Sequence, residues 1–124
     1  MNVFFFPVWG EQYINNFLNI CLPCLDDNLS KLSSKEISNS KLEIWTSKKD
    51  IKLFKNNLIL KRLKKKLKVN YEHIDVLLNL KKNFSNKYQF LAFIQYNFIC
   101  SHIKKYKYLW FLYPDFMFSN NLIK

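Results

Sequence analysis

Polar or otherwise unusual residues that could hold a ligand follow three apolar runs of this chain, at residues 3–6, 42–45 and 108–113. Hydroxyls and carboxylates in such places can hydrogen-bond a polar ligand. The alternative interpretation is that these residues only end the strands and bind no ligand. The residues concerned are Pro7, Val8, Trp9, Gly10 and Glu11 after the first run, Thr46, Ser47 and Asp50 after the second, and Pro114, Asp115, Ser119 and Asn120 after the third.

The three apolar runs predict strands that are buried on both faces, because edge strands usually alternate apolar and polar residues. Between the first two strands, apolar residues recur at helical spacing from Ile14 to Leu25. Pro23 should end or kink this helix, and the polar residues 26–40 predict a loop. The remaining predicted helices are a short one that reaches Phe54, then 58–69, 70–84 and 88–105.

This order of elements predicts one α/β domain over residues 1–124, with a small, mostly parallel sheet of three to four strands flanked by helices. Ligands bind outside the carboxyl ends of the strands in such sheets, because the loops converge there. We therefore expect the three polar sets to lie along one rim of the sheet. A single glycine in 124 residues excludes the glycine-rich loops that cradle phosphates.

The net charge of +11 could attract nucleic acid or an anionic membrane. The excess of lysine over the single arginine also fits a bias toward AT-rich codons. One basic segment, as an amphipathic helix, could bind a membrane surface, or it could be an ordinary solvated face. Nucleic acid is the less favoured partner, because the aromatic residues near 106–110 are explained more simply as strand. The basic segment comprises Lys61, Arg62, Lys64, Lys65, Lys66 and Lys68.

The three cysteines are too few for a disulfide framework and predict a reducing compartment, by default the cytoplasm, with the membrane periphery as an option. Cys21 and Cys24 have the spacing of a redox pair, but they lie near the expected end of a helix, so packing is the preferred interpretation. The two histidines are isolated, and no spacing of four zinc ligands occurs.

Three segments together carry a resemblance to a known family. FFFPVWGEQYINNFLNICLPCL, LEIWTSKKD and YLWFLYPDFMFSN, in this order, resemble the Rossmann-like N-terminal half of a GT-A glycosyltransferase, the nucleotide-diphospho-sugar transferase fold. The resemblance implies a nucleotide-sugar donor held by residues 7–10, Thr46 and Asp50. It also implies that Asp115 contacts the donor ribose and a Mg²⁺ or Mn²⁺ ion on the diphosphate, in place of a glycine-rich loop.

The resemblance also sets limits on the expected activity. Asp115 is followed by Phe116 and Met117 rather than by a second acidic residue, which predicts weak metal binding at best. The sequence stops at Lys124, before the acceptor pocket and catalytic base of the fold, so we expect an incomplete donor-binding half-domain with no assignable catalytic residue. The alternative is a noncatalytic basic module that binds an anionic membrane or nucleic acid.

Overall fold

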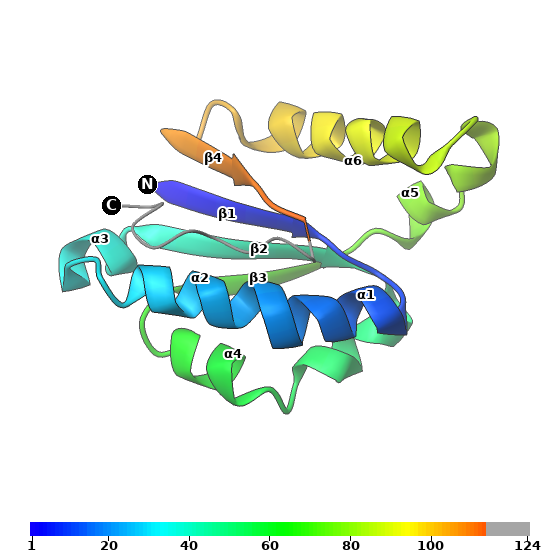
Figure 1. Ribbon diagram of the computed structural model, residues 1–124. Helices are drawn as coiled ribbons and strands as arrows, with labels where there is room; N and C mark the ends of the chain where they lie inside the picture. The colour runs from blue at the N-terminus through cyan, green and yellow to red at the C-terminus, as the bar shows by residue number, and fades with distance from the viewer. Residues whose placement is uncertain (114–124) are drawn as a thin grey trace.

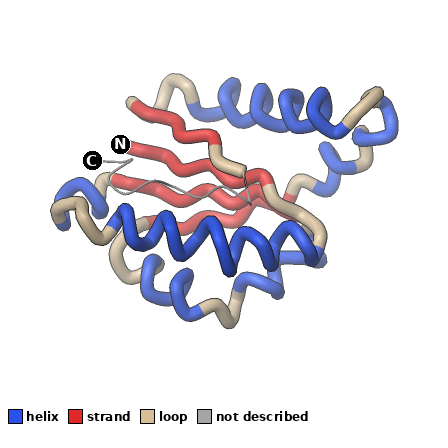
Figure 2. Tube along the Cα trace, in the orientation of Figure 1, coloured by secondary structure: helices blue, strands red, loops and turns tan. Residues whose placement is uncertain are grey.

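The computed structural model describes residues 1–113 and is built around four strands (Figure 1, Figure 2). The strands are β1 (Asn2–Pro7), β2 (Ser40–Thr46), β3 (Lys68–His73) and β4 (Tyr108–Phe111). Their order across the sheet is β3-β2-β1-β4, and each neighbouring pair is parallel. The predicted α/β class, with a small parallel sheet flanked by helices, is confirmed.

The central strand β1 is buried on both faces. Phe4 and Phe6 pack on one face of the sheet, and Val3 and Phe5 pack on the other, all of them fully buried. Such a strand has no polar face, which is why its sequence is a continuous apolar run.

One face of the sheet is covered by the helices of the first two crossovers (Figure 1). Between β1 and β2 the chain forms α1 (Glu11–Asn16), a π-helical turn (Phe17–Cys21), α2 (Leu22–Leu29) and α3 (Ser34–Ser38). Between β2 and β3 it forms a 3-10 helix (Lys48–Phe54) and α4 (Leu58–Leu63). Side chains such as Phe17 and Leu60 close this core against Phe6 and Ile44.

The third crossover covers the opposite face. It contains α5 (Asp75–Leu78), a 3-10 turn (Lys81–Asn83) and α6 (Lys87–His102). Phe90, Ile94 and Phe98 recur every four residues of α6 and pack on Val3 and Phe5. The predicted helix over 88–105 is thus confirmed in type. It begins where the Asn86 side chain accepts hydrogen bonds from two backbone N–H groups.

Pro23 does not end the first helix. The chain passes through a π-helical turn, in which the Leu22 N–H donates to the Phe17 carbonyl, five residues back. Pro23 then lies in the first turn of α2, where a missing N–H and a fixed φ are tolerated. The predicted loop over 26–40 is also wrong, since α2 runs to Leu29 and α3 follows, with a capping box between Ser33 and Glu36.

The prediction of two helices over 58–84 missed a strand. The basic segment begins in α4, turns at residues 64–66 and enters β3 at Lys68, so it is not one amphipathic helix. Val69 and Tyr71 pack against one core, while Asn70 and Glu72 lie on the other face. This alternation is typical of an edge strand, but only a few residues carry it.

The final strand is predicted correctly in type but not in burial. β4 pairs with β1 alone among the described strands, and Tyr108 at its start is half exposed.

In the described part of the chain, no helix has the length and apolar character needed to cross a membrane.

Candidate functional site

A cavity of about 400 Å³ lies at the carboxyl ends of β1 and β4. The chain moves from β1 to β2 to β3 in one direction and then returns to place β4 on the other side of β1. The cavity therefore occupies the point where the strand order reverses, the usual ligand position in open parallel sheets. It is lined by Pro7, Val8, Trp9, Tyr13, Lys81, Lys87, Tyr88, Phe90, Leu91 and Tyr113.

Aromatic rings form much of the cavity wall. The Trp9 ring packs edge-on against Phe90, with ring centroids 5.6 Å apart. Tyr13 and Tyr88 form an exposed rim. The Tyr113 hydroxyl accepts a hydrogen bond from Gln95 Nε2 at 3.0 Å. Flat apolar walls of this kind suit a planar ring such as a nucleobase.

Two lysines supply the positive charge of the cavity. Lys81 comes from the 3-10 turn before α6, and Lys87 is the first residue of α6. The Lys87 ammonium lies 5.1 Å from the centre of the Tyr88 ring. The free N–H groups at the start of α6 are less available, because Asn86 Oδ1 accepts from the N–H groups of Tyr88 and Gln89. Anions in this cavity would therefore meet lysine side chains first.

The loop after β1 has a fixed conformation. Gly10 has φ of +84°, a value that side chains with a Cβ rarely adopt. Its N–H donates to Asp50 Oδ2 at 2.9 Å, and Ser47 Oγ donates to the same oxygen at 2.6 Å. Asp50 is buried and joins the loops that follow β1 and β2. Asp50 thus holds Gly10, the residue that follows Trp9 of the cavity wall.

The residues predicted from sequence are therefore only partly brought together. Pro7, Val8 and Trp9 line the cavity, and Gly10 and Asp50 lie directly behind this loop. Thr46 is fully buried and is absent from the cavity lining; its Oγ1 has no hydrogen-bond partner among the described residues.

The predicted metal contact cannot be placed. Asp115 lies outside the described residues, so its contact with Mg²⁺ or Mn²⁺ stays a prediction. Within residues 1–113, no three side chains of the histidine, cysteine, aspartate and glutamate types come together as metal ligands would.

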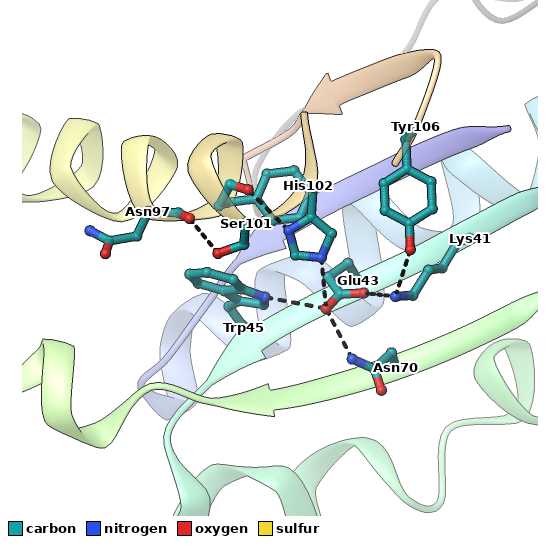
Figure 3. Close-up of polar contacts among 9 residues, drawn as sticks. Lys41, Glu43, Trp45, Asn70, Asn97, Ser101, His102 and Tyr106 are labelled. Atoms are coloured by element: carbon teal, nitrogen blue, oxygen red, sulfur yellow. Dashed lines mark hydrogen bonds and ion pairs between the residues drawn. The ribbon is translucent and has the colours of Figure 1, made fainter. Parts of the chain in front are cut away.

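A second polar arrangement, missed from sequence, surrounds Glu43 of β2 (Figure 3). Its side chain is only 3% exposed, and Oε2 lies 2.6 Å from Lys41 Nζ. Oε1 accepts from Asn70 Nδ2 at 2.9 Å and from Trp45 Nε1 at 3.4 Å. His102 Nε2 approaches the same oxygen at 3.9 Å. We call these five residues the Glu43 cluster.

The Glu43 cluster joins β2, β3 and α6. It lies beside a hollow of about 530 Å³ over β2 and β3. Burial acts to lower the pKa of Lys41, but the hydrogen bond and charge of Glu43, together with Tyr106, outweigh it and raise the pKa above its usual value. The charges of Lys41 and Glu43 are thus paired inside the cluster. The cluster links β2 to β3 and α6 and leaves no unpaired charge on Glu43.

Some of these residues left a signal in the sequence. Glu43 is the only charged residue of the run 42–45, which marks it as unusual in a buried strand. Lys81, Lys87 and Tyr88 gave no signal of their own, because their place at the cavity depends on where the third crossover begins.

Burial of Cys21 agrees with the packing interpretation of the Cys21 and Cys24 pair. Cys21 is the last residue of the π-helical turn and is buried in the core, and Cys24 is partly buried. Cys100 is exposed, and all three cysteines are thiols.

Comparison with known proteins finds no relative. No protein-family model, no curated protein and no solved structure matches the chain.

Proposed function

We propose that the chain binds a nucleotide-diphospho-sugar in the cavity at the carboxyl ends of β1 and β4, as the donor-binding part of a glycosyltransferase. The observation that carries the proposal is the position and lining of this cavity: it lies where the strand order reverses, and it combines aromatic walls with two lysines. The resemblance of the loop at residues 7–10 to GT-A donor loops agrees with this position.

The lining suggests a division of labour for the donor. The Trp9 ring, held by Phe90, offers a flat surface for the base. Lys81 and Lys87 would neutralise the diphosphate and so take the place of a glycine-rich loop, which this sequence lacks. In the transfer itself, the bond between the anomeric carbon and the diphosphate oxygen would break and the nucleoside diphosphate would leave. An acceptor hydroxyl oxygen would bond to that carbon and release its proton to water or to the departing diphosphate.

Calorimetric titration with nucleoside diphosphates tests the proposal. The unmodified chain should bind at least one of UDP, GDP, ADP and CDP saturably. The double variant Lys81→Gln/Lys87→Gln should raise the Kd by about tenfold or more, since a charge-assisted hydrogen bond contributes about 1.5–3 kcal/mol. The matched control Lys61→Gln/Lys65→Gln removes two exposed lysines that do not line the cavity.

The same titration separates the proposal from its alternative. A noncatalytic basic module would show either no saturable binding or equal losses in both double variants, because it would respond to net charge alone. Either result would refute the nucleotide-sugar proposal.

A further inference from the structure

The outer face of α6 carries an exposed apolar stripe. Its members follow one another every three or four residues and therefore lie on one line along the helix. Tyr96 is 65% exposed and Ile103 is 60% exposed. Tyr108, at the start of β4, is also exposed. The full stripe is Tyr88, Ala92, Tyr96, Cys100 and Ile103.

The chain around this stripe is basic and contains no acid. Residues 76–113 include no aspartate or glutamate. Three lysines precede or open α6, and three follow it, so positive charge lies at both ends of the stripe. The six are Lys81, Lys82, Lys87, Lys104, Lys105 and Lys107, and all are exposed.

The basic segment at residues 61–68 lacks this combination. Its leucines, Leu63 and Leu67, are buried in the core, as is Leu60 just before it, and cannot enter a membrane. Arg62 is paired with Asp26. The segment therefore presents lysine head groups without an apolar face, whereas α6 presents both.

We propose that the α6 stripe, with Lys104, Lys105 and Lys107, lies on an anionic lipid surface. α6 is apolar on its buried face as well, so its exposed apolar side chains would enter the headgroup level while the lysines beyond its end meet lipid charge. Tyrosine suits this boundary because its ring is apolar and its hydroxyl is polar. At 16 residues, α6 would lie along the surface for about 24 Å.

Lipid is favoured over single-stranded nucleic acid by the aliphatic members of the stripe. Nucleic-acid platforms use aromatic rings on which bases stack. Ala92 and Ile103 cannot stack with a base, but both can be buried among acyl chains. The charge of this region complements either partner, so the apolar residues decide between them.

Flotation of the full chain with phospholipid vesicles tests the proposal. The chain should bind vesicles of phosphatidylcholine with roughly one third phosphatidylserine, and not phosphatidylcholine alone. Lys104→Gln/Lys105→Gln/Lys107→Gln should weaken binding by about tenfold or more, since each lysine near an anionic surface contributes about 1 kcal/mol. The control Lys64→Gln/Lys65→Gln/Lys66→Gln loses the same charge and should keep most of the binding.

A second pair of variants tests the apolar contribution. Tyr96→Ser/Ile103→Ser should also weaken vesicle binding, whereas Leu58→Ser/Val76→Ser, which alters two even more exposed apolar residues elsewhere, should not. The residues changed in the two lysine triples and in the two serine doubles do not line the cavity, so nucleotide binding should be unchanged in all four variants.

Three outcomes would overturn the proposal. One is a lack of binding to anionic vesicles, and another is an equal loss in both lysine triples, which would mean that net charge alone acts. The third is tight binding of a single-stranded oligonucleotide that the α6 variants weaken while vesicle binding is unchanged.

Discussion

At the scale of single residues, the buried charges of the Glu43 cluster hold the sheet to α6. Glu43 and Lys41 lie on the same face of β2, and both side chains are nearly removed from solvent. Breaking such a pair leaves one buried charge without its partner, which costs more than the intact pair contributes.

Glu43→Gln should therefore lower the free energy of unfolding by about 3 kcal/mol, because Lys41 loses its anion. Lys41→Met/Glu43→Gln should recover part of this loss, since neither charge then remains. Urea denaturation of the two variants and the unmodified chain measures the difference. A loss below about 0.5 kcal/mol in the single variant would place the pair among weak surface pairs.

Tyr71 offers a second test at this scale. Burial raises the pKa of its phenol to about 12. Because the folded pKa lies above the unfolded value, the neutral phenol stabilises the fold below about pH 10, and this contribution is lost as pH rises through 12.

An alkaline titration followed by tyrosinate absorbance should accordingly show a late transition from Tyr71, near pH 12. The hydrogen bond with Cys100 also raises the pKa of Tyr96, but the Tyr96 ring is exposed. Tyr71→Phe should remove the transition near pH 12. A titration in which the late transition persists in the variant would assign it to another residue.

At the scale of elements, the sequence was most informative where one environment persists along a segment. β1, β2 and α6 each have buried residues along much of their length, and the apolar pattern predicted each of them in type. β3 is as long as β1, but it was missed because it is an edge strand whose alternation begins inside a lysine-rich stretch. Of the two effects expected from Pro23, the end of the helix did not occur, because a π-helical turn before it lets the chain continue into α2 with Pro23 in its first turn.

The basic segment provides the prediction at this scale. Leu63→Ala should lower the free energy of unfolding by about 3 kcal/mol, since it empties a fully buried position. Lys65→Ala, two residues away and exposed, should change it by less than about 0.5 kcal/mol. Equal losses in urea denaturation would mean that the leucines do not face the core.

At the scale of the whole molecule, the order β3-β2-β1-β4 creates the candidate site. The sequence predicted that a ligand would bind at the carboxyl ends of the strands, and it named residues 7–9 of the cavity lining. It could not predict Lys81, Lys87 or Tyr88, because only the placement of the third crossover brings the start of α6 to that edge. The role of Asp50 also depends on this scale, since it joins two loops forty residues apart in sequence.

The most direct test of the nucleotide-binding proposal uses the three tryptophans as internal probes. Their indole N–H signals can be followed by NMR while a nucleoside diphosphate is added. Trp9 lines the cavity, whereas Trp45 belongs to the Glu43 cluster and Trp110 lies on β4. We predict a saturable shift of the Trp9 signal with little change in the other two. Saturation without a shift at Trp9, or with the largest shift at Trp45 or Trp110, would contradict the account.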